Sequence, residues 1–233
     1  MRQKLMTAAG IAGLAALILI CQMLGTYLKE RTAPDEKAAE TTAGARRGCT
    51  VVLDPGHGGI DAGKTGVNGT EEKEVNLKIA LKIKEILKKE AIEVVMTRDT
   101  DERLADSQVE DLKERVSVMN QAEPVIAVSI HQNSYHEESV KGAQVFYHSQ
   151  SREGEKAAGV IQEQLNELQT DNTKKTKSND TYYILKNTEV PVVIVECGFL
   201  SNYEEAEKLS DNAHQEKIAA AVAGGIMSYM SGK

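Results

Sequence analysis

The stretch "VPVVIVECGF" (residues 190–199) decides the fold that we expect for this chain. Every residue up to Val195 is apolar, so a strand formed here has no face suited to water. A second run, "PVIAVSI" (residues 124–130), has the same almost wholly apolar character. Strands that are buried on both faces are typical of mixed or parallel sheets covered by helices on both sides. The two runs therefore predict an α/β protein with a central sheet.

The segments around these runs alternate between strand and helix patterns. Residues 74–90 repeat apolar side chains at helical spacing, which predicts an amphipathic helix. Further strands are expected at residues 50–54, 92–97, 142–148 and 181–186, and further helices at residues 110–121, 151–169 and 214–230. We therefore expect a single domain over residues 49–233, built on a mixed, mostly buried, twisted sheet of about six strands with helices on both faces.

The N-terminal part of the chain has a different character. Residues 6–28 are 23 residues without a charge, and a helix of that length spans about 35 Å, enough for a hydrocarbon core of about 30 Å. We therefore expect residues 1–28 to form a transmembrane helix that anchors the protein, with a cleaved signal segment as the alternative. Residues 29–48 are polar and lack apolar periodicity, which predicts a flexible linker. The short basic flank before the helix favours a domain on the extracytoplasmic face, anchored or secreted.

Charge is distributed unevenly along the chain. Residues 1–48 contain seven Lys/Arg and four Asp/Glu, a net charge of +3, which leaves −10 for residues 49–233 out of the total of −7. An acidic domain repels phosphate groups instead of releasing their counterions. We therefore expect no nucleic acid partner.

Polar side chains stand where several of the predicted strands end, which is where open α/β sheets bind their ligands. They are His57 after the first strand, Glu71 and Glu72 at the start of the first helix, His131 and Asn133 after "PVIAVSI", and Glu196 after Val195. Two histidines and a glutamate, with water at the fourth position, are common ligands of a catalytic zinc ion. A further carboxylate would be free to act on that water. This spacing does not choose between Glu71 and Glu72.

Each of these residues also has a purely structural explanation. A histidine after a strand commonly caps a turn, and a glutamate pair at the start of a helix interacts favourably with the helix dipole. Glu196 is harder to explain in this way, because burying an unpaired charge beside Val195 would cost several kcal/mol. Their joint placement favours the metal site.

Six motifs in order carry a family resemblance: "LDPGHGG", "EEKEVNL", "MTRDTD", "DLKERVSVMN", "SIHQNS" and "VIVECGFLSN". The chain resembles the zinc-dependent N-acetylmuramoyl-L-alanine amidases of bacterial cell-wall turnover over residues 50–231. The segments "GAQVFYH" and "NTKKTKSNDTYYILKNTEVP" look more like the CwlD-type branch, which acts on spore-cortex peptidoglycan during sporulation.

The resemblance implies a Zn²⁺ ion held by His57, Glu72 and His131, with Glu196 as the catalytic carboxylate. Glu72 is implied because the family places this ligand directly before a lysine, here Lys73. The implied reaction is hydrolysis of the amide between N-acetylmuramic acid and the L-alanine of the stem peptide, in cortex maturation with muramic-lactam formation or in cell-wall turnover. The alternatives are a zinc peptidase acting within the stem peptide and a non-catalytic cell-wall binding module.

Several weaker expectations complete the site. Asn133 is a candidate substrate-binding residue, and Gln132, where the family commonly has a small residue, is expected to alter the rim without removing a ligand. The glycines at 56, 58 and 59 are expected to clear space for the polymer. Arg115, like Arg98, is expected in structural ion pairs, and Asp54 either orients a ligand or caps a turn.

The expected partners follow from this function and from the N-terminal helix. They are peptidoglycan, the membrane and an accessory lipoprotein. Only seven residues, "YHEESVK" (residues 135–141), separate Ser134 from Gly142, too few for the inhibitory helix that some members of the family insert there. The resemblance therefore implies an uncovered site.

Overall fold

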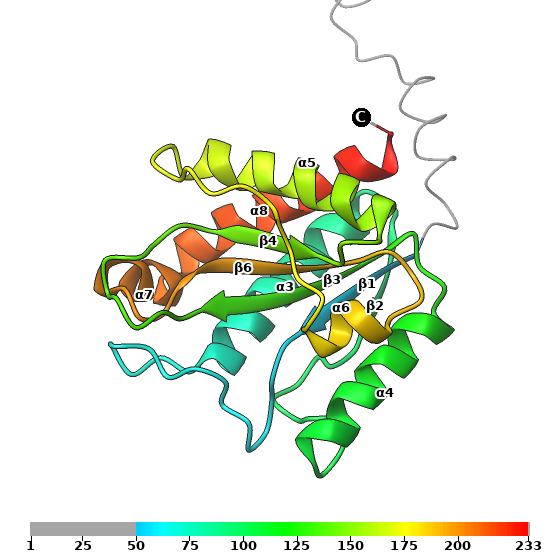
Figure 1. The fold of residues 1–233 in the computed structure, drawn as a ribbon, viewed down its shortest axis with the longest axis horizontal. Coiled ribbons are helices and arrows are strands. Elements are labelled where there is room, and N and C mark those ends of the chain that lie inside the picture. Colours follow the sequence, from blue (N-terminus) through cyan, green and yellow to red (C-terminus); the bar gives the residue numbers. More distant parts are fainter. Residues whose placement is uncertain (1–49, 233) are drawn as a thin grey trace, which may run out of the picture. The chain divides into compact units, whose positions relative to one another are not determined.

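The structure, a computed structural model, describes residues 50–232 (Figure 1). The strands are β1 (Thr50–Pro55), β2 (Glu93–Met96), β3 (Ile126–Asn133), β4 (Gln144–Tyr147), β5 (Lys177–Ser178) and β6 (Val192–Phe199). The helices are α3 (Glu72–Lys89), α4 (Gln108–Gln121), α5 (Arg152–Leu168), α6 (Tyr183–Asn187), α7 (Tyr203–Ser210) and α8 (Asn212–Met230).

The expected membrane helix and linker, residues 1–28 and 29–48, lie outside the described residues. Within residues 50–232, no helix combines the length and the apolar character needed to cross a membrane.

The six strands form one mixed sheet in the order β2-β1-β3-β6-β4-β5. Strands β2, β1, β3 and β6 pair in parallel, β4 runs antiparallel to β6, and β5 runs parallel to β4. The two apolar runs become the adjacent central strands β3 and β6, as their burial requirement predicts. In their register His131 stands opposite Glu196, so two candidate site residues are neighbours across the sheet.

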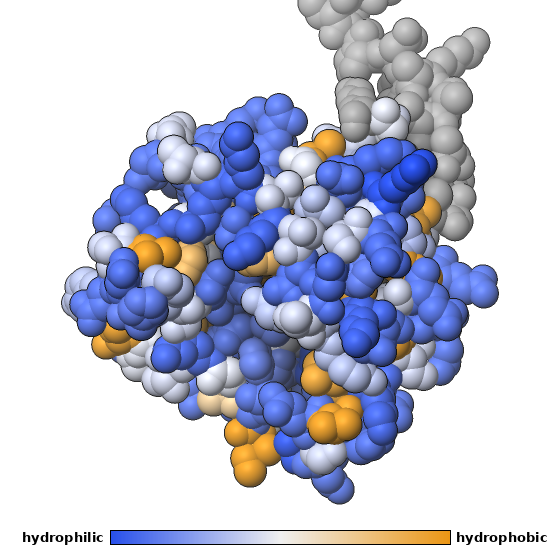
Figure 2. All heavy atoms as spheres, viewed as in Figure 1, coloured by the Kyte–Doolittle hydropathy of each residue, from blue (hydrophilic) through white to orange (hydrophobic). Residues whose placement is uncertain are grey.

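Helices cover both faces of the sheet (Figure 1). Because side chains alternate along a strand, β1 sends Leu53 to the face packed against α3, α5 and α8, and Val52 to the face packed against α4 and α6. In β6, Ile194 belongs to the α4/α6 face. The same alternation places Glu196, two residues later, on that face. The surface drawn in Figure 2 is mostly hydrophilic with separate apolar patches, so the two apolar clusters are largely internal.

One predicted strand is wrong. Residues 181–186 were expected in the sheet, but the chain forms the short helix α6 there, and Ile184 and Leu185 pack into the apolar cluster of the α4/α6 face. The side chain of Asn179 accepts hydrogen bonds from the backbone N–H groups of Thr181 and Tyr182, and this turn leads the chain off the sheet. The position beside β4 is taken by β5 instead.

Helix α7 was not predicted, although its start carries a recognisable signal. The Asn202 side chain accepts the backbone N–H of Glu205, which is the standard N-terminal cap. Three residues separate the helix from the end of β6, and one residue separates it from α8. Its eight residues are too few to show helical periodicity clearly.

Candidate active site

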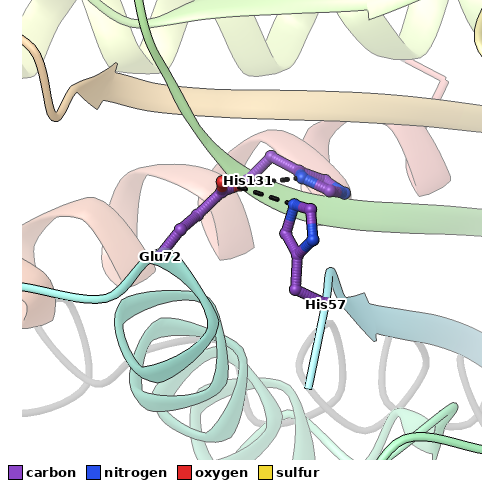
Figure 3. A group of neighbouring side chains, drawn as sticks. All are labelled: His57, Glu72 and His131. Atoms are coloured by element: carbon purple, nitrogen blue, oxygen red, sulfur yellow. Dashed lines mark hydrogen bonds and ion pairs between the residues drawn. The ribbon is translucent and has the colours of Figure 1, made fainter. Parts of the chain in front are cut away.

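Three side chains from different elements point toward one another at the carboxyl-terminal edge of the sheet (Figure 3). His57 follows β1, Glu72 is the first residue of α3, and His131 lies in β3. One ligand atom from each lies within 4.8 Å of the others. The Nδ1 atom of His131 is 2.9 Å from Oε1 of Glu72, and Nε2 of His57 is 3.3 Å from Oε2. Glu71 instead pairs with Lys73 at 3.4 Å. The structure thus brings Glu72, and not Glu71, to the histidines.

The backbone around His57 has an unusual conformation. His57 has a φ of 63°, in the left-handed region that non-glycine residues rarely adopt. Its carbonyl oxygen accepts a hydrogen bond of 2.6 Å from Arg115, and the preceding carbonyls of Pro55 and Gly56 accept bonds from Arg98 at 2.9 and 3.0 Å. The two arginines therefore hold this turn through its main chain, which presents the His57 side chain to Glu72.

Glycine at position 56 has a different role from the one expected. A Cβ atom there would overlap the ring of His131, so Gly56 lets the histidine ring lie against the backbone. A Cβ on Gly58 would meet Arg98 and the Glu102 carbonyl instead of the pocket. These two glycines therefore make room for protein side chains, which corrects the expectation that they clear space for the polymer.

Asp61 is a site residue that sequence reasoning missed. Its Oδ2 atom is 2.9 Å from Nδ1 of His57, and its Oδ1 accepts the backbone N–H of Gly63 at 3.0 Å. Burial opposes protonation of His57, but the carboxylates of Glu72 and Asp61 outweigh it and raise the pKa of His57 to about 9. A carboxylate on the second ring nitrogen is the usual support for a metal-binding histidine. Its signal in the sequence is an aspartate four residues after the histidine, within the same glycine-rich turn.

The Glu72 carboxylate is held by several N–H donors. Its Oε2 accepts the backbone N–H of Lys64 at 2.8 Å, and Oε1 accepts those of Gln132 at 3.1 Å and of the Asn76 side chain at 3.4 Å. Burial alone would raise the pKa of Glu72, but the two neighbouring histidines lower it below its ordinary range. The carboxylate is therefore ionised and fixed in position.

The side chain of Gln132 is buried, so it lies in the wall of the pocket and not at its rim as expected. Its Nε2 donates to Oδ1 of Asn76 at 3.1 Å, which turns the amide nitrogen of Asn76 toward Glu72. Gln132 thus helps to hold the Glu72 carboxylate in place through Asn76.

Glu196 lies inside β6 and is only 7% exposed. Strand β6 continues for three residues beyond it, so the residue stands within the strand and not at its end. Its Oε2 atom has no hydrogen-bond partner among the described residues. Burial raises the pKa of Glu196 to about 7. A buried, unpaired carboxylate with a pKa near neutrality is suited to proton transfer.

These residues share a pocket of about 250 Å³. Besides the three clustered side chains and Glu196, its walls include Asn133, Lys64 and Tyr182. The Oδ1 atom of Asn133 accepts a hydrogen bond from the backbone N–H of Ser134, and the residue is part of the pocket wall. A larger cavity of about 610 Å³, beside α7 and the end of α5, contains none of the predicted site residues.

A second buried ionic cluster lies beneath the same turn. Arg115 is 1% exposed and contacts Asp54 at 2.7 Å and Asp111 at 2.6 Å. Asp54 also accepts hydrogen bonds from Thr97 and Ser129, both at 2.6 Å. The expected ion-pair role of Arg115 is confirmed. Asp54 contacts none of the clustered ligand candidates and caps no turn. It binds Arg115, which in turn donates a hydrogen bond to the carbonyl oxygen of His57.

Comparisons with known proteins agree with this geometry. Residues 51–228 match the family model described as N-acetylmuramoyl-L-alanine amidase. The germination-specific N-acetylmuramoyl-L-alanine amidase of Bacillus subtilis is 36% identical over 194 residues, which cover 80% of this chain and 81% of that protein. The amidase AmiA of Escherichia coli is 32% identical over 266 residues, covering 94% and 89% of the two chains.

Solved structures show the same likeness. The CwlD amidase from Clostridioides difficile, determined in complex with the GerS lipoprotein, superposes with a TM-score of 0.76 at 36% identity and covers 79% of this chain and all of that one. The catalytic domain of CwlV from Bacillus (Paenibacillus) polymyxa gives a TM-score of 0.72 at 32% identity, covering 79% and 99%. The chain therefore belongs to the N-acetylmuramoyl-L-alanine amidases and has their peptidoglycan-hydrolysing activity, as its motifs predict.

Proposed function

We propose that this amidase is zinc-dependent, that His57, Glu72 and His131 hold one Zn²⁺ ion, and that Glu196 is its catalytic carboxylate. The observation that carries the proposal is the meeting of two imidazoles and one carboxylate, within 4.8 Å, beside a buried carboxylate oxygen that has no partner in the described chain.

The types of ligand atom and the charge at the site both suit a zinc ion. Two histidines and one glutamate are a donor set of catalytic zinc sites. Two carboxylates, Glu72 and Glu196, are buried in one small pocket, and the negative charge around His57 raises its pKa to about 9. A cation bound to the three ligands would offset this excess of negative charge. Asp61 already occupies the second nitrogen of His57, which leaves Nε2 for a metal.

The chain's own residues account for the proton transfers. Bound zinc supplies a Lewis acid that lowers the pKa of water and polarises the amide carbonyl. Glu196 accepts the proton of the attacking water on its unpartnered oxygen and delivers it to the nitrogen of the departing L-alanine. In the metal-free protein, burial raises the pKa of Glu196 to about 7, so this carboxyl can take up a proton near neutral pH.

We further propose that the substrate is spore-cortex peptidoglycan. The support is the likeness to a germination-specific amidase and to the CwlD amidase. Hydrolysis there would expose the muramic acid for lactam formation. Because the CwlD structure contains the GerS lipoprotein, an accessory lipoprotein is a partner to test for this chain. Residues 1–28 would anchor the domain on the extracytoplasmic face of the membrane.

Digestion of purified peptidoglycan tests the proposed reaction. The protein is incubated with the polymer after chelation and again after addition of Zn²⁺, and the products are identified by mass. We expect stem peptides with a free N-terminal L-alanine only in the presence of zinc. Cleavage within the stem peptide would indicate a zinc peptidase, and binding without release of peptides would indicate a wall-binding module. Activity that is indifferent to chelators would end the metal proposal.

A further inference from the structure

Tyr182 stands in the wall of the active-site pocket and has no role in the chemistry described above. It lines the pocket together with Glu196, His131 and Ile194, and it remains 37% exposed. It directly precedes α6, the helix that replaces a predicted strand. Because α6 packs on the same face of the sheet as Glu196, this segment brings an aromatic side chain to the pocket from a distant part of the chain.

The position of the Tyr182 ring is fixed by the protein. The ring packs edge-to-face on the buried ring of Phe146, with 5.7 Å between centroids and an angle of 62°. Its backbone N–H donates to Oδ1 of Asn179 at 3.0 Å. An aromatic pair of this geometry is favourable beyond its buried area. The side chain is therefore held at the pocket before any ligand arrives.

The hydroxyl group of Tyr182 has no hydrogen-bond partner among residues 50–232. Burial, and next the negative charges of Glu196 and Glu72, raise the pKa of Tyr182 above its ordinary value. The hydroxyl is thus a protonated donor at neutral pH. A phenol that is partly exposed beside a pocket usually finds a partner in a ligand or in water.

We propose that Tyr182 contacts the substrate, donating a hydrogen bond from its hydroxyl to a carbonyl oxygen next to the scissile amide. This inference rests on the proposed function, because the scissile bond lies near Tyr182 only if Glu196 is the catalytic carboxylate. The substrate offers such acceptors on both sides of the scissile amide: the N-acetyl carbonyl of muramic acid and the L-alanine carbonyl of the stem peptide. The opposing explanation is that Tyr182 only covers Phe146, in which case the ring alone matters and the hydroxyl contributes nothing.

Removal of the hydroxyl alone separates the two explanations. Tyr182→Phe keeps the ring and its contact with Phe146, and Tyr203→Phe is the matched control, since Tyr203 is 68% exposed and lies outside the pocket. We expect Tyr182→Phe to lower kcat/KM by roughly 3- to 10-fold, the effect of one net hydrogen bond. We expect Tyr203→Phe to leave kcat/KM unchanged.

A binding measurement makes the test independent of turnover. In the Glu196→Gln background, calorimetry with a soluble N-acetylmuramoyl peptide should show a dissociation constant that Tyr182→Phe raises by a similar factor. Equal kcat/KM and equal binding in the Phe variant would overturn the proposal. So would a shifted acid limb of the pH–rate profile with unchanged binding, because Tyr182 would then act through Glu196. Failure of the wild-type protein to release peptides would instead count against the proposed function.

Discussion

Two buried ionic clusters lie on either side of the turn at residues 55–57, and they differ in how completely their polar atoms are paired. In the Arg115 cluster, the guanidinium contacts Asp54 and Asp111, and Asp54 accepts two further hydroxyl hydrogen bonds. In the His57–Glu72–His131 cluster, the groups pair with one another, with Asp61 and with the N–H donors around Glu72, but the neighbouring Glu196 keeps an unpaired oxygen.

The difference in pairing distinguishes a cluster with a structural role from one that can bind a ligand. A charge that is buried and fully paired has no hydrogen-bonding capacity left for a ligand. Removal of one partner of such a pair is expected to lower the free energy of unfolding. A charge that is buried and incompletely paired costs stability until a ligand arrives, and such groups concentrate at functional sites. Burial by itself does not distinguish the two clusters, because Asp54 and Glu72 are 1% and 4% exposed.

The largest effect is expected from Glu196→Gln. The amide cannot accept the proton of the attacking water, so kcat/KM should fall by about 10²- to 10⁴-fold. Zinc should remain bound, because Glu196 is not among the three clustered ligand candidates. Steady-state rates on a soluble muramoyl peptide and metal analysis by mass spectrometry check both statements.

Glu71→Gln is the matched control for this variant. Glu71 precedes Glu72 at the start of α3 but pairs with Lys73, so its substitution should leave both rate and zinc content unchanged. Loss of zinc from the Glu196 variant, or a strong loss of rate in the Glu71 variant, would contradict the division of roles.

Arg115→Met should instead reduce stability. The change leaves Asp54 and Asp111 buried without their cation, so we expect the free energy of unfolding to fall by about 3–5 kcal/mol. Lys113→Met is the control on the same helix: Lys113 forms an exposed pair with Glu110, and its loss should leave the free energy of unfolding nearly unchanged. Denaturant titration measures both variants. Equal losses would show that pairing in the buried cluster has no special importance.

The sequence predicted the fold and the meeting of the two histidines because both depend on long-range patterns that local detail does not change, whereas the choice of Glu72 over Glu71 came from the family resemblance. Two almost wholly apolar runs had to become neighbouring buried strands, and parallel strands bring their carboxyl ends, with His57 and His131, to one edge. The support of the cluster could not be predicted in the same way. The contact of Asp61 depends on the left-handed backbone of His57, and that of Gln132 on the direction of one buried amide.

Residues 181–186 show a second limit. A short apolar run such as "YYIL" has no period long enough to separate helix from strand, and here the Asn179 turn decided the outcome. The sequence alone therefore does not predict helix α6 or the position of Tyr182 at the pocket.

Incomplete pairing also predicts a pH-dependent cost in the metal-free protein. The pKa of Glu196 is about 7 in the fold against 4.5 ordinarily, so the fold favours the protonated carboxyl. The contribution of protonated Glu196 to the free energy of unfolding is then fully present below pH 4.5 and is lost as the pH rises through about 7. Glu196→Gln should therefore stabilise the metal-free domain at pH 8 by up to about 3 kcal/mol and have no effect at pH 4. Thermal unfolding after chelation, at both pH values, measures this difference; a stabilisation equal at both would contradict the cause.

The smallest effect is expected from the contact that supports His57. Asp61→Asn can keep the hydrogen bond to Gly63 through Oδ1, but it places an amide N–H where a carboxylate oxygen faces Nδ1 of His57. That change favours the tautomer with the proton on Nε2, the nitrogen directed at Glu72, so zinc has to displace it. We expect zinc affinity to fall by about 10- to 100-fold, measured by competition with a chromogenic chelator. Asp180→Asn, which alters an exposed aspartate bound to Ser149, should leave the affinity unchanged. If Asp61→Asn also leaves it unchanged, His57 does not depend on this carboxylate, and the support of the open cluster rests on the donors around Glu72 alone.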